Sequence, residues 1–281
     1  MRSRGRIGTV FGAATCLLAA TLSGAPASGQ PVPVQAADET DVDLELVIAV
    51  DVSLSMDLDE QALQREGYVK AFLDPQVISA IEQGLHGRIA VAYVEWAGAI
   101  SQYVTVNWTL IDGREAAAEM SALLAEAPIA RLRRTSISGA LVFSAGLFDD
   151  NGYRGMRRVI DVSGDGPTNQ GTRTDLARDA VVARGITING LPFVPSPDGP
   201  LSLFDLPDLD IYYEDCVIGG PGSFSLPVHS ATEFAEAIRN KLVLEIAGAE
   251  RPKLIRTSAA APRIPCDIGE RQWQMFMDGD R

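Results

Sequence analysis

Short apolar blocks alternate along the chain with segments in which apolar residues recur at helical spacing. Residues 42–50 alternate at first and then become continuously apolar, as the central strand of a parallel sheet does. A short link that contains Gly98 joins the apolar blocks at residues 88–97 and 100–111, and this link predicts a hairpin with one antiparallel edge. Strands are predicted at residues 42–50, 88–97, 100–111, 157–163 (which ends in a Gly/Asp turn at 164–166) and 186–193.

Helical segments separate these strands. Pro75 and Pro128 follow the first two segments and are expected to end them, and Gly185 is expected to be the C-cap of a later one. Residues 211–228 contain a Gly-Pro-Gly turn and are predicted to form two further strands. Helices are predicted at residues 60–73, 113–127, 136–148, 172–185 and 231–248.

This order of elements predicts an α/β fold. Strands that alternate with helices form an open, doubly wound, mostly parallel sheet with helices on both faces, and the hairpin adds one antiparallel edge. The predicted domain covers residues 42–248. Residues 249–281 are polar and contain prolines, so they are predicted to form a C-terminal tail.

The N-terminus has the layout of a secretory signal peptide. Three arginines precede a short apolar segment at residues 10–22, and small residues follow it up to residue 29. The apolar segment is shorter than the ~20 residues that a spanning helix needs, although an uncleaved anchor remains the alternative. We therefore expect residues 1–29 to be removed and residues 30–41 to form an exposed leader. The protein is expected in the periplasm or outside the cell, without stable membrane insertion after cleavage.

The balance of charge excludes some classes of partner. The chain carries a net charge of -13, and removal of the three N-terminal arginines makes it -16. Nucleic acids and anionic membranes select basic surfaces, so neither is an expected partner.

Two cysteines remain after cleavage of the signal peptide, Cys216 and Cys266. In an oxidising compartment an even pair predicts a disulfide, and two buried free thiols are the alternative. The bond would tether the tail and, for a loop of about 50 residues, stabilise the fold by ~4 kcal/mol in the chain-entropy model. Neither cysteine has a His or Cys neighbour in sequence, which disfavours zinc.

Polar side chains gather where ligands bind in open α/β sheets, beyond the carboxyl ends of the strands. Asp51, Ser53 and Ser55 directly follow the first strand. Thr135 opens the third helix, and Asp165 follows the fourth strand. These five oxygen donors suit Mg²⁺, or Mn²⁺ or Ca²⁺, partly through water, and they leave one position for a partner's carboxylate.

In this order, the five residues resemble the metal-ion-dependent adhesion site of von Willebrand factor A-type domains. The segments "RRTSISGAL" and "RRVIDVSGDGPTN" look closer still to an exported bacterial family of unknown function. The resemblance implies a Rossmann-like fold. It also implies direct coordination by Ser53 and Ser55, direct or water-mediated coordination by Thr135, and action mainly through water by Asp51 and Asp165.

The sequence departs from the family pattern at two places. Many members have Gly before the Thr, where this chain has Arg133 and Arg134. These cations either steer an acidic ligand or face solvent. The third motif is "VSGDG", and Asp161 inside that strand is the rival carboxylate. Without this context, Asp-x-Ser-x-Ser is a weak signal, because the hydroxyls could merely cap the helix near Glu60.

Two classes of function fit these residues. The first is a non-enzymatic, exported module that binds an acidic protein ligand through a divalent cation. The alternative is an exported metal-dependent hydrolase, which also needs a general base. The chain has two histidines, His86 and His229, and both are expected to face solvent or cap a helix. A cytosolic chelatase or ATPase subunit would share the domain, but the signal peptide argues against it.

Overall fold

The computed structural model describes residues 39–195, 205–248 and 262–279. The predicted signal peptide and residues 30–38 of the predicted leader lie outside the described residues. The leader's end belongs to β1 (Thr40–Val42), which pairs in parallel with β5 (Tyr153–Gly155). The division between domain and tail after residue 248 stays a prediction, because residues 249–261 are not described.

The main sheet of the described chain is mostly parallel, which confirms the predicted fold class. Its strand order is β4-β3-β2-β6-β7, and only the β3–β4 pair is antiparallel. The strands are β2 (Leu44–Asp51), β3 (Ile89–Trp96), β4 (Gln102–Ile111), β6 (Arg158–Gly164) and β7 (Thr187–Pro192).

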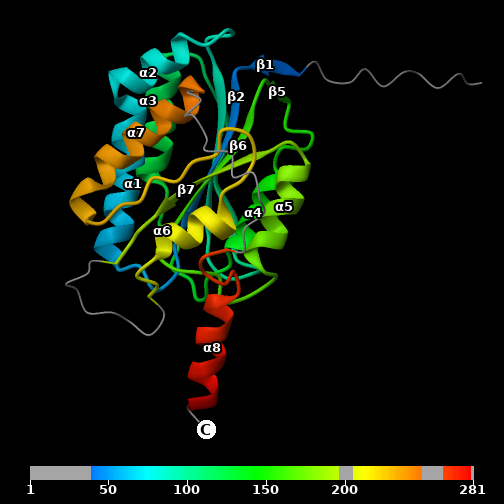
Figure 1. Cartoon of the computed structure of the whole chain (residues 1–281). Helices are drawn as coiled ribbons and strands as arrows, with labels where there is room; N and C mark the ends of the chain where they lie inside the picture. The colour runs from blue at the N-terminus through cyan, green and yellow to red at the C-terminus, as the bar shows by residue number, and fades with distance from the viewer. Residues whose placement is uncertain (1–38, 196–204, 249–261, 280–281) are drawn as a thin grey trace, which may run out of the picture. The chain divides into compact units, whose positions relative to one another are not determined.

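Helices cover both faces of this sheet (Figure 1). Ile48 of β2 packs in the core under α1, α2, α3 and α7, whereas the neighbouring Val47 and Ala49 pack in the core under α4 and α5. Because both faces of β2 are covered, the strand is buried along its whole length and is apolar almost throughout. The helices are α1 (Leu58–Leu73), α2 (Pro75–Glu82), α3 (Arg114–Glu126), α4 (Ile137–Gly146), α5 (Thr174–Ala183) and α7 (Phe234–Ala247).

The direction of winding changes beside β2. The chain passes from β2 to β3 on one side, and it later returns to place β6 on the other side. The carboxyl ends of β2 and β6 therefore meet at a switch in strand order, where open α/β sheets bind their ligands.

Pro75 has a different role from the one predicted. It ends no element by itself, since α1 stops at Leu73 and Pro75 is the first residue of α2. Asp74 lies between the helices and accepts a hydrogen bond from the backbone N–H of Gln76 at 2.8 Å. Proline fits the first helical position because its missing N–H would have no partner there.

The predicted strand pair at residues 211–228 is wrong. The segment begins within α6 (Leu209–Tyr212) and continues as a π-helical turn, Tyr213–Val217, followed by a loop that only bridges to β7. Leu209, Tyr212 and Tyr213 are buried, and their spacing is that of a helical face. The packing role expected for both tyrosines is confirmed.

The tail is attached as predicted and contains an element that was not predicted. A disulfide joins Cys216 to Cys266, and α8 (Ile268–Gly279) follows it directly. No helix in the described ranges is long and apolar enough to cross a membrane.

Candidate metal centre

The loop after β2 turns its polar side chains toward the loop after β6. Asp51 ends β2, and its Oδ1 accepts the backbone N–H of Ser53 at 2.7 Å. The Oγ atoms of Ser53 and Ser55 lie 2.8 Å apart. Ser55 Oγ donates to Oδ1 of Asp165 at 2.8 Å, although the two residues are far apart in sequence. The structure thus brings these four predicted residues together.

Backbone contacts fix the shape of the first loop. The side chain amide of Gln61 donates to the Ser53 carbonyl at 3.1 Å, and the Leu132 N–H donates to the Val52 carbonyl at 3.0 Å. The N-cap of α1 is Asp57, whose side chain accepts the Glu60 N–H at 2.8 Å. The helix is therefore capped without Ser53 or Ser55, which leaves their hydroxyls for another role.

Thr135 reaches the same place from the start of α4. Its N–H donates to the side chain of Asn169 at 3.0 Å, and its carbonyl accepts the Asn169 N–H at 2.9 Å. The next residue, Ser136, is the N-cap of α4 and accepts the Gly139 N–H at 3.1 Å. These bonds fix the backbone at the buried Thr135, which lies in the wall of the same cavity as the two serines.

The residues surround a cavity of about 490 Å³. Asp51 lies behind its wall, fully buried, while the other four predicted residues line it. Its lining is Ser53, Leu54, Ser55, Arg133, Arg134, Thr135, Asp165, Gly166, Pro167, Asn169, Asp205 and Trp273.

The two carboxylates of the site are short of positive charge. Burial raises the pKa of Asp51 well above its ordinary value, and the nearby Asp165 raises it further. Burial likewise raises the pKa of Asp165, to about 7. Oδ2 of Asp51 is buried without a hydrogen-bond partner, beside Gly164. Within the described ranges neither carboxylate forms an ion pair, so a divalent cation would supply the missing charge.

The donor set fits a hard cation. It offers three hydroxyls and two carboxylates, and hard divalent ions prefer such oxygen ligands. In the part of the chain that is described, no group of three or more His, Cys, Asp or Glu side chains is placed to hold a metal. A cation at this cavity would consequently depend on the hydroxyls of Ser53, Ser55 and Thr135.

The two arginines of the unusual motif differ in environment. Arg133 is exposed, and Arg134 is half-buried with a φ of 74°. This left-handed conformation favours glycine and costs a larger side chain on the order of 1 kcal/mol. The Arg134 guanidinium lies 3.4 Å from the centre of the Trp273 ring.

Trp273 was missed by the sequence reasoning. It belongs to α8 in the tail, and no spacing in the sequence relates it to the metal motif. The disulfide was the one signal that placed the tail against the domain. The rival carboxylate Asp161 lies away from the cavity, in a buried ion pair with Lys241 at 2.5 Å. Neither His86 nor His229 lines the cavity.

Comparisons with known proteins support the fold. A family model described as "Protein of unknown function (DUF1194)" matches residues 41–250. No curated protein matches the chain. The solved structures of similar fold include proximal thread matrix protein 1 from the mussel byssus, at 13% identity and a TM-score of 0.53 over 74% of this chain and 49% of that one.

Two further similar structures are bacterial. The von Willebrand factor type A protein from Catenulispora acidiphila is 14% identical, with a TM-score of 0.50, over 73% of this chain and 43% of that one. The pilus adhesin SpaC from Lactobacillus rhamnosus GG is 10% identical, with a TM-score of 0.54, over 74% of this chain and 31% of that one. This chain thus spans half of these proteins or less, and the likeness establishes a von Willebrand factor A-type fold. A second structure of the mussel protein, with a TM-score of 0.51, is described as having a zinc-occupied MIDAS motif.

Proposed function

This chain belongs to the DUF1194 family, and we propose that it is an exported, non-enzymatic binding module that recognises an acidic protein ligand through a divalent cation. The cation would be Mg²⁺, Mn²⁺ or Ca²⁺. The observation that carries the proposal is the convergence of Ser53, Ser55 and Asp165 within hydrogen-bond distance at one wall of a cavity, in front of the buried Asp51.

Each residue has a distinct part in the proposal. Ser53 and Ser55 hold the cation through their hydroxyls, and Thr135 joins them from α4. Asp51 and Asp165 balance its charge, and Asp51 also fixes the loop by accepting the Ser53 N–H. The bound cation supplies a Lewis-acidic position for a ligand carboxylate. The zinc-occupied motif of the mussel protein, which shares the fold, supports a metal here.

The surroundings favour an acidic ligand. Arg133 and Arg134 line the same cavity, and no acid in the described ranges forms an ion pair with either. Asp165 and Asp205 line it as well, so with a divalent cation bound the two arginines would give this cavity a net positive rim that would steer acidic groups toward it, in a chain with a net charge of -13. A ligand without a carboxylate would leave both the cation and this rim unused.

Export is part of the same proposal. The N-terminal layout predicts secretion into the periplasm or beyond, and the disulfide between Cys216 and Cys266 suits an oxidising compartment. Hydrolysis is disfavoured, because a hydrolase needs a general base and no histidine is among the residues that line the cavity. Asp165, whose pKa is raised to about 7, is assigned to the cation in this proposal.

Calorimetric titration of Mg²⁺ and Mn²⁺ into the full chain tests the proposal. We expect binding at one site in the wild type, and loss of that binding in Asp165→Ala and in Ser53→Ala. Asp179→Ala is the matched control, because Asp179 is an exposed acid that pairs with Arg178 and does not line the cavity. Absence of binding in the wild type would refute the proposal.

A turnover screen with the same ions separates binding from catalysis. The screen covers ester, phosphoester and peptide substrates at saturating metal. Hydrolysis that disappears in Asp165→Ala would overturn the non-enzymatic assignment. Metal binding without turnover would support it.

A further inference from the structure

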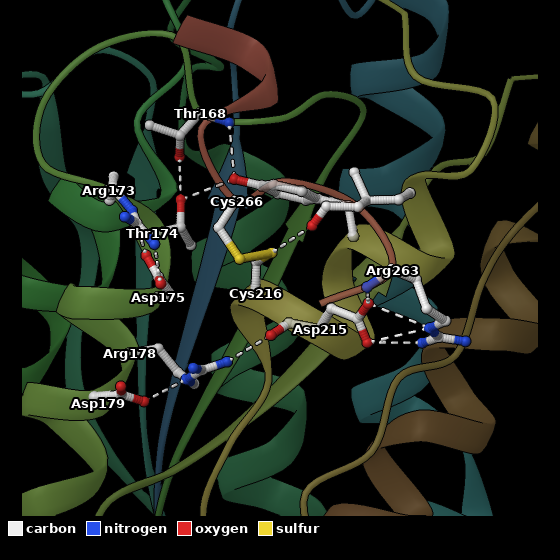
Figure 2. The surroundings of a disulfide bond; sticks show 12 residues. Thr168, Arg173, Thr174, Asp175, Arg178, Asp179, Asp215, Cys216, Arg263 and Cys266 are labelled. Atoms are coloured by element: carbon white, nitrogen blue, oxygen red, sulfur yellow. Dashed lines mark hydrogen bonds and ion pairs between the residues drawn. A yellow bond between two sulfur atoms is a disulfide. The ribbon is translucent and has the colours of Figure 1, made fainter. Parts of the chain in front are cut away.

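The tail is fastened to the domain close to the cavity. The disulfide joins Cys266 to Cys216, and the Arg263 guanidinium donates to Asp215 at 2.9 Å (Figure 2). The same guanidinium donates to Glu214 at 2.6 Å. The Arg263 N–H also donates to the Asp215 carboxylate at 2.6 Å. A covalent bond and charged hydrogen bonds thus fix the chain just before α8.

The first turn of α8 lies directly on the loop that follows β6. A Cβ atom added at Gly269 would lie 2.1 Å from the carbonyl oxygen of Thr168, so only glycine fits there. Thr168 stands three residues after Asp165 in that loop. One turn beyond Gly269, Trp273 enters the cavity wall. The helix is therefore held at a definite place beside the candidate metal centre.

Arg134 and Trp273 form one composite surface. The guanidinium carbon lies 3.4 Å from the ring centre, a stacking distance that occupies the flat face of the guanidinium. Stacking leaves the N–H groups at its edge available, and these groups bind a carboxylate in a bidentate manner. No hydrogen bond of the Arg134 side chain is found among the described residues. The chain maintains this arrangement despite the left-handed backbone at Arg134.

We propose that Arg134, supported by Trp273 of the tail, is a second carboxylate-binding position, so that the cavity selects ligands with two neighbouring acidic groups. The inference rests on the proposed function, since the first carboxylate would bind the cation at Ser53, Ser55 and Asp165. The cavity of about 490 Å³ has room for such a ligand, because small-molecule sites of this size accept whole compounds. The tail is then part of the binding site.

Calorimetry with short peptides at saturating Mg²⁺ tests this assignment. The probes are N-acetylated, C-amidated dipeptides with the sequences Glu-Glu, Glu-Gln and Gln-Glu. We expect the diacid to bind at least about tenfold more tightly than either mono-acid, as for one charge-assisted bidentate pair. In Arg134→Gly the diacid should fall to the affinity of the mono-acids, while Mg²⁺ affinity stays within about twofold of wild type. Glycine suits the backbone at this position, so Thr135 keeps its place.

Changes in the tail give an independent test. Trp273→Ala removes the support of the guanidinium, and Gly269→Ala forces α8 away from Thr168 without changing a side chain of the cavity. Both should lower the preference for the diacid without loss of Mg²⁺ binding. Gln274→Ala on the exposed side of α8 is the control for the helix, and the exposed Arg131→Gln is the control for the loop.

The outcomes are distinguishable. Equal binding of diacid and mono-acid by the wild type, or an unchanged preference in Arg134→Gly, would overturn the inference and leave the proposed function intact. Loss of Mg²⁺ binding in Arg134→Gly or Trp273→Ala would also overturn it, because these residues would then act by maintaining the metal site. A wild type that binds no Mg²⁺ would overturn the proposed function and this inference with it.

Discussion

Lys241 lies in the core between two carboxylates. Its Nζ is 2.5 Å from Oδ1 of Asp161 on β6 and 2.5 Å from Oε1 of Glu245 one turn further along α7. All three side chains are almost completely buried. Asn189 donates to Glu245 at 2.9 Å, and the Tyr68 hydroxyl donates to Asp161 at 3.5 Å. The single ammonium is thus the main compensation for two buried acids.

Lys241→Met should therefore destabilise the fold strongly. Methionine fills much of the same volume, so the loss is mainly electrostatic. Removal of one partner from a buried ion pair costs about 3–5 kcal/mol, because the remaining charge has no compensation. A domain is stable by only about 5–15 kcal/mol in total, so this one substitution would remove a large part of the stability.

The loss should depend on pH. In the native wild type, burial raises the pKa of Asp161, and burial raises the pKa of Glu245 to about 7. Lys241 opposes both shifts, so its removal raises both pKa values further. In the folded variant Asp161 and Glu245 stay protonated at pH values where the unfolded chain has already released these protons, above a pH of about 4. The free energy of unfolding of the variant therefore falls as the pH rises from there through the folded pKa values. The loss should be larger at pH 8 than at pH 5, by about 1 kcal/mol or more, since one pKa unit corresponds to about 1.4 kcal/mol.

Urea unfolding of the full chain, followed by far-ultraviolet circular dichroism at pH 5 and pH 8, measures both effects. Lys70→Met is the matched control, because Lys70 is exposed and its ion pair with Glu66 is worth at most about 1 kcal/mol. The triple variant Lys241→Met, Asp161→Asn, Glu245→Gln should recover most of the stability. A loss below about 1 kcal/mol, or an equal loss at both pH values, would refute the reasoning.

Four further results are expected. Asp57→Ala should cost about 1 kcal/mol in urea unfolding, because it removes the capping box of α1. Gly190→Ala should cost about 1–3 kcal/mol in the same assay, since its Cβ would lie 2.6 Å from the ring of Tyr213. Mg²⁺ at about 100 times its dissociation constant should add about 2.7 kcal/mol to the wild type by thermal unfolding, and nothing to Asp165→Ala. Cys266→Ser should lower the affinity for the Glu-Glu dipeptide in calorimetry while Mg²⁺ binding remains, because it frees the tail.

The sheet and the polar character of the loop after β2 could be predicted, because both follow from local patterns in the sequence. Residues 46–50 are apolar on both faces of β2, and that continuous run predicts a central parallel strand. Parallel strands end at one edge, so the polar residues after β2 and β6 had to be neighbours there. The hydrogen bond from Ser55 to Asp165 is a direct consequence of that topology.

The element at residues 211–228 could not be predicted from its turn signals. Its Gly-Pro-Gly turn and aromatic residues are typical of strands, but the buried Tyr212, Tyr213 and Cys216 recur with helical spacing. The close approach of Tyr213 to Gly164 and Gly190 determines the outcome, and this contact joins residues far apart in sequence. Tertiary packing therefore decided between two local preferences.

Asp161 in β6 and Asp165 in the loop after β6 show how a carboxylate with a structural role differs from one that can bind a ligand. Asp161 and Asp165 are four residues apart, and burial raises the pKa of both. The fold supplies Asp161 with Lys241, whereas Asp165 and Asp51 receive no ion pair from the described residues. A carboxylate whose charge is already balanced by a lysine gains little from an external cation. Asp51 and Asp165 lack such a partner and lie beside a cavity lined by Ser53 and Ser55, so an external cation can balance their charge. Addition of Mg²⁺ should consequently leave the loss of stability caused by Lys241→Met unchanged in size. That variant lacks a positive charge beside Asp161 and Glu245, which are buried in the core and do not line the cavity.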